Sequence, residues 1–547
     1  MIFCWKLHRI FAVGLVLMSG TVPKVIAELG PDDPVMVGLT ITMASSLDPT
    51  DGSTPWALIS HGIAEKLFTV DKDNNIVGQI ANKVEKISDF VWEVTLKGGH
   101  KFSDGTDVTA QHVADSLANQ NAKNSYAQAS LETMTVTAPS DLTVRIESTR
   151  QTHVMDSVLA EFAFPIYLAK DDGSFVFTGP FVVESFEEGL IQLKPNEFYD
   201  DKAAERPMVT LKKFGDGNAL ADGLKNHDLD IAMHLPIDTL EDLRDANFEV
   251  KSFEVGYHYM VWHNTDAPGP LSDIRVRQAV DHAIDRKRLS QALQGGHATR
   301  SLFPDNSPFF HEMEGLQNNN GNEDTAVTLL EEAGWMLNSD GKREKEGQIL
   351  TLKLVAYPHR PGLVIMQPEI KEQLEDIGIT VDDVLTGFDW PETATIISNR
   401  TFDLLMWAQH TLPAGDPLFF LNAHLRSDGG SNYANIQSAT IDARLDALSV
   451  EENHDLRVLL SQAAQEAILE EMPVSNLVTP DWHVGLSECL KDYEPWGSDY
   501  YVIRSDLKKP DAGCYDTSGA FDYKNGNAAV LMTMLPFVAT LIAMGMA

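Results

Sequence analysis

A stretch near the middle of the chain, from Asn264 to Arg286, constrains the fold more than any other. It reads NTDAPGPLSDIRVRQAVDHAIDR. Its two prolines predict a turn, and Ser272 or Asp273 can cap a helix that follows. Apolar residues then recur at helical spacing and predict a buried face: Ala279, Val280, Ala283 and Ile284. The charged start of this helix therefore indicates a structural role and no contact with a ligand.

A second pattern runs from Val91 to Leu117 and reads VWEVTLKGGHKFSDGTDVTAQHVADSL. Trp92, Val94 and Leu96 alternate with polar residues, which predicts a half-buried strand. Glycines then predict turns, and Thr109 to Leu117 is expected to be helical. The segment is therefore a strand, a glycine-rich turn and a helix in succession.

Both stretches resemble signatures of the family 5 extracellular solute-binding proteins, the receptors of peptide and nickel ABC importers. The first supplies the Asp-x-Arg-x-Arg-Gln-Ala run, and the second supplies the strand, turn and helix. The resemblance extends over roughly Val35 to Ile503 and includes four further segments: TGPFVVESFEEGLIQLKPNEFYDD, TAVTLLEEAGW, EQLEDIGITVDDV and FDLLMWAQHTLPAGDPLFF. It is closest to the nickel-binding branch.

The resemblance implies an α/β fold, a two-lobed clamp like that of periplasmic binding proteins, with an extra inserted domain and the ligand in the cleft between the lobes. A chain of 547 residues is long enough for at least two lobes. Closure on the ligand would be a hinge motion. The expected boundaries are 28–56, 166–255 and 479–517 for lobe I, 57–165 for the inserted subdomain and 256–478 for lobe II.

The composition excludes some partners. The formal net charge is -38, and hydrophobic residues make up 43% of the chain. This charge disfavours nucleic acid and anionic membranes, because proteins that neutralise phosphates need clustered lysine and arginine. Two interpretations stay open: the acidic residues form a solubilising coat, or they attract cationic or metal-bearing solutes.

Targeting signals are predicted near both ends. Basic residues precede an apolar run, Ile10 to Met18, and a small-residue cleavage site follows, so residues 1–27 are expected to be a signal peptide. Residues 518–547 have the order of a glycosylphosphatidylinositol (GPI) signal. Small residues beginning at Ser518 come first, a polar spacer follows, and an apolar tail comes last, so attachment is predicted at Ser518. A plain membrane span is the alternative.

Loss of the signal peptide leaves two cysteines, Cys489 and Cys514, in a chain expected to reach an oxidising compartment. We therefore expect one disulfide between them. Asn399 begins the single predicted acceptor site for N-glycosylation, in an expected turn between a helix and a strand.

The sequence gives no support for catalysis. It has no HExxH, no Gly-x-Ser-x-Gly and no glycine-rich phosphate loop. We therefore expect a binding protein that is not an enzyme and that has no resident cofactor, so that a metal would arrive only as part of the ligand.

The segment WAQHTLPAGDP, residues 407–417, contains the residues expected to select the ligand. The resemblance implies that peptide-binding members carry an aspartate three positions after Trp407, where it pairs with the peptide's amino terminus. Here that position is His410, and a neutral imidazole cannot replace the negative charge. Asp416 could substitute if the loop turns it inward.

The nickel-binding branch lacks the same aspartate and binds its metal as a chelate, which a histidine helps to coordinate. His410 and His424 are the two candidates for that role. In this branch an arginine holds the carboxylates of the carrier, the small organic molecule that chelates the metal. No basic residue stands at the corresponding place, near residues 162–165. Lys123 and Tyr126 lie where another basic contact and an aromatic contact are expected.

These residues predict a small metal chelate or peptide-like solute, taken up with the help of a membrane transporter. The protein is expected to act as a monomer. The alternative is a GPI-anchored surface sensing or adhesion protein that keeps the receptor fold without transport.

Overall fold

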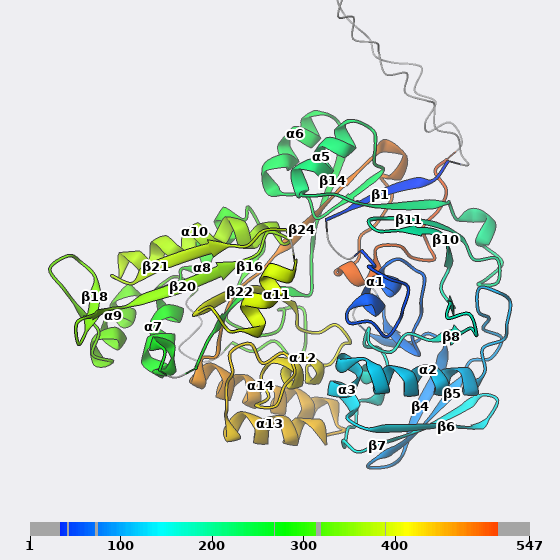
Figure 1. The fold of residues 1–547 in the computed structure, drawn as a ribbon, viewed down its shortest axis with the longest axis horizontal. Coiled ribbons are helices and arrows are strands. Elements are labelled where there is room, and N and C mark those ends of the chain that lie inside the picture. Colours follow the sequence, from blue (N-terminus) through cyan, green and yellow to red (C-terminus); the bar gives the residue numbers. More distant parts are fainter. Residues whose placement is uncertain are drawn as a thin grey trace, which may run out of the picture. The chain divides into compact units, whose positions relative to one another are not determined.

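The computed structural model describes residues 33–40, 43–71, 75–266, 268–312, 319–388 and 390–511 (Figure 1). The predicted signal peptide, Cys514, Ser518 and the predicted GPI signal lie outside these residues. Within the described ranges, no helix has both the length and the apolar character needed to cross a membrane.

One lobe is built on a seven-stranded mixed sheet with the order β10-β11-β12-β1-β13-β24-β14. Strand β1 is central because it pairs in parallel with both β12 and β13. Helices α5 (Gly217–Lys225) and α6 (Leu240–Asp245) lie together beside β13 and β14 (Figure 1). The strands are β1 (Val35–Leu39), β10 (Phe181–Glu187), β11 (Leu190–Pro195), β12 (Val209–Lys213), β13 (Ile231–Met233), β14 (Glu249–Glu254) and β24 (Asp481–Leu486).

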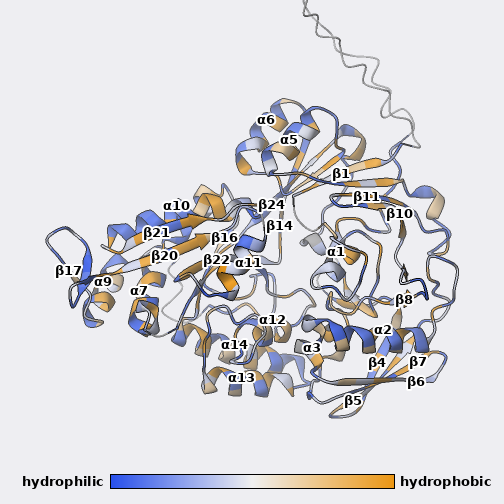
Figure 2. Ribbon diagram, in the orientation of Figure 1, coloured by the Kyte–Doolittle hydropathy of each residue, from blue (hydrophilic) through white to orange (hydrophobic). Residues whose placement is uncertain are grey.

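The other lobe is built on a six-stranded sheet with the order β16-β23-β15-β22-β20-β21. Figure 2 shows hydrophobic residues concentrated on its inner strands, and all seven residues of β15 are buried. The strands are β15 (Tyr257–His263), β16 (His297–Ala298), β20 (Thr351–Ala356), β21 (Thr380–Leu385), β22 (Leu404–His410) and β23 (Val474–Thr479). The helices are α7 (Ile274–Ala283), α8 (Arg286–Ala292), α9 (Glu323–Glu332), α10 (Pro361–Asp376), α11 (Trp390–Ser398), α12 (Leu418–His424), α13 (Ala439–Ser449) and α14 (His454–Glu471).

Helix α7 follows the pattern predicted for residues 264–286. The Asp273 side chain caps the helix by accepting a hydrogen bond from the backbone N–H of Arg275 at 3.0 Å. Ala279, Val280 and Ala283 are buried, as their spacing predicted. The prediction of a structural helix at this motif is therefore confirmed.

A four-stranded antiparallel sheet lies between residues 81 and 148, with the order β4-β5-β7-β6. Trp92 and Val94 on β5 are buried, as their alternation predicted. The helix expected from Thr109 to Leu117 is present as α2, and Thr109 caps it. The elements are β4 (Ala81–Ser88), β5 (Val91–Leu96), β6 (Met134–Ser140), β7 (Thr143–Ser148), α2 (Ala110–Lys123) and α3 (Ser125–Leu131).

Shorter elements complete the described chain. They are α1 (Thr54–Ser60), α4 (Met155–Val158), the paired strands β2 (Phe68–Val70) and β3 (Ile76–Gly78), the paired strands β8 (Tyr167–Ala169) and β9 (Phe175–Phe177), and a small sheet of β17 (Met336–Leu337), β18 (Arg343–Lys345) and β19 (Gln348–Ile349).

The chain passes twice between the two large sheets, and the two crossings lie side by side. The first crossing joins β14 to β15 through Gly256, and the second joins β23 to β24 through Pro480. Strand β14 pairs with β24, and β15 pairs with β23, on either side of these residues. The structure is therefore the predicted two-lobed α/β fold, while the residue boundaries assigned to its domains stay a prediction.

Candidate ligand-binding site

A cavity of about 680 Å³ lies where the six-stranded lobe, the crossing segments and the segment around the four-stranded sheet meet. Its volume is in the range of small-molecule sites in proteins. The lining residues used below are Asp156, Glu254, Gly256, Phe309, His410, Asp416, Glu452, Arg457 and Tyr501. Two of the predicted ligand residues, His410 and Asp416, therefore face this cavity.

His410 ends β22 and is almost fully buried, with 6% of its surface exposed. Its ring centroid lies 5.1 Å from that of Tyr257 and 5.7 Å from that of Tyr500. A Cβ atom at Gly256 would lie 2.4 Å from Cε1 of His410, so only glycine leaves room for the imidazole. The first crossing segment and the end of β22 thus fix the ring from two sides.

The hydrogen bonding of His410 indicates which nitrogen carries its proton. The backbone N–H of Leu412 donates to Nδ1 of His410 at 3.3 Å. In a neutral imidazole one nitrogen accepts and the other donates. The proton of neutral His410 therefore resides on Nε2 in this arrangement.

Trp407, on the same strand as His410, belongs to an aromatic cluster whose other rings come from other parts of the lobe. Its ring lies 5.2 Å from Tyr357, 4.9 Å from Tyr433 and 6.1 Å from Trp390. Its indole N–H donates to Oε1 of Gln409 at 3.1 Å. Trp407 has 8% of its surface exposed, so it acts chiefly as a packing residue, while Trp390 beside it is 45% exposed.

Tyr126 and Lys123, which were predicted to contact the ligand together, have different surroundings. Tyr126 is half-buried on α3 with its ring 5.1 Å from Phe162, and burial raises its pKa. Phe162 in turn contacts Phe419 of the other lobe at 6.3 Å. Lys123 is exposed in the last turn of α2, and neither residue lines the cavity.

Asp416 faces the cavity, but Arg457 neutralises its carboxylate. Its two oxygens accept hydrogen bonds from Nε and an Nη atom of Arg457 at 2.9 and 2.7 Å, and Oδ1 also accepts from the backbone N–H of Leu418. Arg457 donates further to the carbonyl oxygens of Leu448 and Glu451. A direct contact between Asp416 and a ligand would have to compete with this buried ion pair.

His424, the second predicted metal ligand, does not line the cavity. Its ring stacks on Trp262 at a centroid distance of 5.7 Å, and its Nδ1 lies 3.2 Å from the carbonyl oxygen of Ser431. Burial lowers its pKa to about 4. In the described part of the chain, no three histidine, cysteine, aspartate or glutamate side chains form a group that could hold a metal ion. His424 therefore has the surroundings of a core residue.

Two predicted modification sites fall partly within the described chain. Asn399 is exposed in a turn between α11 and β22, as expected for an acceptor of N-glycosylation. Cys489 is disulfide-bonded, but Cys514 lies outside the described residues, so their pairing stays a prediction.

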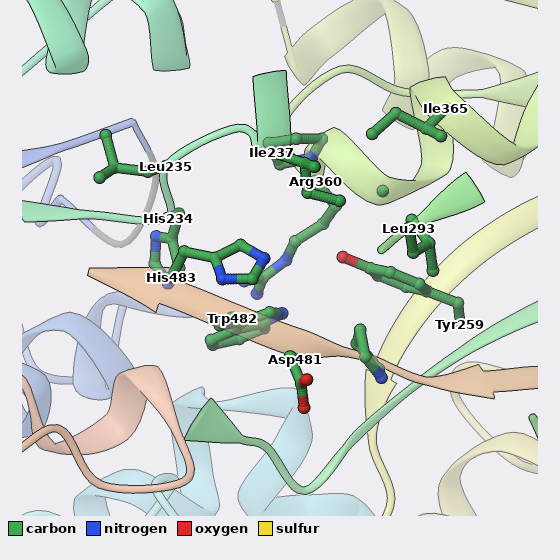
Figure 3. Close-up of a pocket in the computed structure, with 13 residues that line it drawn as sticks. His234, Leu235, Ile237, Tyr259, Leu293, Arg360, Ile365, Asp481, Trp482 and His483 are labelled. Atoms are coloured by element: carbon green, nitrogen blue, oxygen red, sulfur yellow. The ribbon is translucent and has the colours of Figure 1, made fainter. Parts of the chain in front are cut away.

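A buried arginine beside the crossings could not be found from the sequence. The guanidinium of Arg360 lies 4.7 Å from the ring centroids of both Tyr257 and Trp482. Figure 3 shows its side chain reaching toward Trp482, beside His234 and His483, while the carboxylate of Asp481 points away. The cavity here has a volume of only about 30 Å³, which suits water better than a solute. An arginine before a proline gives no local signal of such cation–π contacts.

Comparison with known proteins identifies the family. A model described as bacterial extracellular solute-binding proteins, family 5 middle, matches residues 75–432. The nickel-binding protein NikA of Staphylococcus aureus is 25% identical over 479 residues, which cover 84% of this chain and 91% of that protein. The oligopeptide-binding protein AppA of Bacillus subtilis is 23% identical over 485 residues, which cover 83% of this chain and 87% of that protein.

Solved structures share the fold. The structure of NikA from Staphylococcus aureus in complex with Ni(L-His)2 matches with a TM-score of 0.76 at 21% identity, covering 87% of this chain and 99% of that chain. AppA from Bacillus subtilis in complex with a nonapeptide matches with a TM-score of 0.73 at 20% identity, covering 88% and 99%. The chain belongs to the family 5 bacterial extracellular solute-binding proteins, whose members bind solutes for ABC transporters and are not enzymes.

Proposed function

We propose that this protein binds a small metal chelate or peptide-like solute in the 680 Å³ cavity and presents it to a membrane transporter for uptake. One observation carries the proposal: His410 is buried at the end of β22 and lines the cavity. The relatives of this protein include a nickel-binding protein and an oligopeptide-binding protein, so both solute classes occur among them.

The side chain at position 410 favours the chelate over a peptide with a free amino group. The resemblance to peptide-binding members places an aspartate at this position, opposite the ammonium. A buried ammonium without a partner is costly, and a neutral imidazole offers no compensating charge. A chelate needs no carboxylate at this position.

We further infer that His410 holds the organic carrier and does not ligate the metal. With Nδ1 accepting from the backbone N–H of Leu412, Nε2 carries the proton and acts as a donor. Metal binding through Nε2 would require the proton to move to Nδ1, which would remove that hydrogen bond.

Calorimetry with a tripeptide and with nickel and iron chelates tests the proposal. His410→Ala should weaken chelate binding at least about tenfold, or about 1.4 kcal/mol, and His410→Asp should move the preference toward the peptide. His410→Gln, which keeps an N–H donor, should retain most of the affinity if His410 holds the carrier. His297→Ala serves as the control, because His297 is exposed and does not line the cavity. Tight peptide binding by the unaltered protein, without response to any chelate, contradicts the proposal.

We propose that the protein acts at the outer cell surface and is held there by a GPI anchor attached at Ser518. Support comes from the order of small residues, polar spacer and apolar residues in the sequence. Phosphatidylinositol-specific phospholipase C should release the protein from intact cells. Retention on the cells, with residues after 527 found in the mature protein by mass spectrometry, contradicts the anchor.

A further inference from the structure

We propose that Lys86, His153 and Glu452 form an electrostatic latch between the segment around the four-stranded sheet and the six-stranded lobe, and that this latch slows the exit of a solute from the 680 Å³ cavity. The effect on solute exit rests on the proposed function, which places the solute in this cavity. The latch itself is a property of the protein, so it can be tested without a solute.

Glu452 joins the two parts of the protein. It lies in the turn between α13 and α14 of the six-stranded lobe, and its Oε1 accepts a hydrogen bond from Nζ of Lys86 at 2.5 Å. Lys86 is on β4 of the four-stranded sheet, 366 residues away in the sequence. Nδ1 of His153, which lies between β7 and α4, is 2.7 Å from the same oxygen. One carboxylate oxygen of the lobe therefore contacts two basic side chains from the other part.

The ammonium of Lys86 is held in position by residues of its own part. Oδ1 of Asp89, in the turn after β4, lies 3.0 Å from Nζ of Lys86, and Nδ1 of His153 lies 2.8 Å from it. The three N–H donors of the ammonium thus have Asp89, His153 and Glu452 within reach. A side chain that is already positioned loses less entropy when it pairs, and this loss is what makes most exposed ion pairs weak.

The turn that carries Glu452 is also held in position. Asn453 caps α14 by accepting a hydrogen bond from the backbone N–H of Leu456 at 3.0 Å. The buried guanidinium of Arg457 donates to the carbonyl oxygen of Glu451 at 2.8 Å. Both sides of the latch therefore have bonds of their own that fix their geometry.

The latch lies at the edge of the cavity. Glu452 and His153 line the cavity, whereas Lys86 does not. The side chain of Glu452 is 61% exposed and that of Lys86 26% exposed, while His153 is 4% exposed. The ion cluster is thus the place where the lining reaches the protein surface. Separation of Glu452 from the two basic residues would open the cavity there.

Charge distinguishes the latch from two other contacts between the same parts. Lys86, and next His153, hold the pKa of Glu452 below its usual range, so its carboxylate is ionised at neutral pH. The hydroxyl of Ser157 donates to the carbonyl oxygen of Ala414, and helix α3 packs against α12. Salt weakens exposed ion pairs and leaves such uncharged contacts largely unaffected. Open and closed forms of a protein commonly differ by little free energy, so a modest latch shifts their populations.

Spin labels on the two parts report opening without a solute. Ala122 on α2 and Ala443 on α13 are exposed, so cysteines introduced there can be labelled, whereas Cys489 is disulfide-bonded. The distance between the labels, measured by double electron–electron resonance, should lengthen in Lys86→Met and in Glu452→Gln. Added salt should lengthen it in the protein with the intact latch, and less in either variant.

Solute exit is measured as the dissociation rate of the nickel complex of two L-histidines. Lys86→Met, at a residue outside the cavity lining, should raise this rate by roughly three- to tenfold. Glu452→Gln should raise it as well, and the double variant should match Glu452→Gln because both changes break the same contact. Glu85→Gln is the matched control: Glu85 pairs with Lys83 on the same strand, β4, at 2.8 Å, and that pair does not join the two parts. Circular dichroism melting curves check that all variants fold.

The outcomes separate the latch from the proposed function. Unchanged label distances in both Lys86→Met and Glu452→Gln overturn the latch, and so does an equal lengthening in Glu85→Gln. Longer distances without faster dissociation overturn the control of solute exit. If neither the nickel complex nor a tripeptide binds the unaltered protein, the proposed solute class is wrong and the claim about its exit falls with it, while the label distances still decide whether the latch exists.

Discussion

Gly256 shows how a single missing side chain shapes the cavity wall. A Cβ atom there would lie 2.4 Å from Cε1 and 2.8 Å from Nε2 of His410, which is closer than real contacts allow. Gly256→Ala should therefore displace the imidazole, destabilise the protein by about 1–3 kcal/mol and weaken solute binding. Thermal unfolding and calorimetry measure the two effects.

Gly215→Ala is the matched control for this change. A Cβ atom at Gly215 would have no heavy atom within 4 Å. That variant should unfold at or slightly above the temperature of the unaltered protein, because alanine restricts the unfolded chain. Equal stability and affinity of the Gly256→Ala and Gly215→Ala variants would show that His410 is not confined by the crossing.

The buried imidazole of His424 should make the folded protein less stable in acid. Burial lowers its pKa to about 4, whereas an unfolded histidine has a pKa of about 6.5. Between these values the unfolded chain takes up a proton that the folded chain does not. The stability is therefore fully present above about pH 6.5 and falls as the pH decreases toward 4, by about 2 kcal/mol at about pH 5.

The variant His424→Phe removes this titration while keeping an aromatic ring beside Trp262. The stability difference between the unaltered protein and the variant should shrink by about 2 kcal/mol from neutral pH to about pH 5, as urea unfolding would measure. His297→Gln is the control, because His297 is exposed. A stability difference that stays constant over this pH range contradicts a neutral buried His424.

At the scale of elements, buried ion pairs and hydrogen bonds connect α7 with α8 and α8 with β23. Asp281 on α7 forms an ion pair with Arg286 on α8, and Nε of Arg300 donates to Asp281 at 3.0 Å. Arg286 also donates to the carbonyl oxygen of Asn476 on β23 at 2.6 Å. These contacts explain why charged residues of the family motif lie inside the lobe.

Removing one partner from this network should be strongly destabilising. Arg286→Met should lower the free energy of unfolding by about 3–5 kcal/mol, because Asp281 would keep a buried charge with less compensation. Arg275→Met, at a half-exposed arginine of the same stretch, should change it by less than about 1 kcal/mol. Urea unfolding of the two variants gives the comparison, and equal losses would contradict the network.

The sequence predicted those elements whose signal is local. Helix α7 and strand β5 follow from spacing, caps and alternation within a few residues, and the two-lobed fold follows from the resemblance. Partners distant in the sequence could not be predicted. The pairing of Asp416 with Arg457 joins a loop to α14, and the stacking of Arg360 depends on both crossings.

The candidate site was predicted only in part for the same reason. His410, which the resemblance marks as the third position after Trp407, lines the cavity. His424 comes later on a short helix, α12, where neither spacing nor composition distinguishes a core residue from a cavity residue. Its burial results from Trp262 and Tyr433, which come from other parts of the lobe.

At the scale of the whole molecule, the loop of residues 411–417 makes a third connection between parts of the protein. Ala414 is fully buried in the hydrophobic core beside the four-stranded sheet. The hydroxyl of Ser157 donates to its carbonyl oxygen at 2.8 Å. The loop thus connects the six-stranded lobe to that core.

Ala414→Glu should release this contact, since a carboxylate cannot enter an apolar core without a large cost. The radius of gyration from small-angle X-ray scattering should increase, and the solute should dissociate faster. Ala122→Glu is the control, because Ala122 is exposed on α2. An unchanged radius and dissociation rate in Ala414→Glu would show that the loop does not hold the parts together.

The order of strands in the seven-stranded sheet has a consequence for synthesis of the chain. Strand β13 needs β24 as its neighbour, and about 250 residues separate them. At roughly 5–20 residues per second, the ribosome takes about 13–50 seconds to supply the missing strand. The other strands of the six-stranded sheet are made during that interval, and its last strand, β23, ends just before β24 begins. The lobe with the seven-stranded sheet therefore begins first and is completed last. Until β24 is made, the edge of β13 stays unpaired and accessible to chaperones.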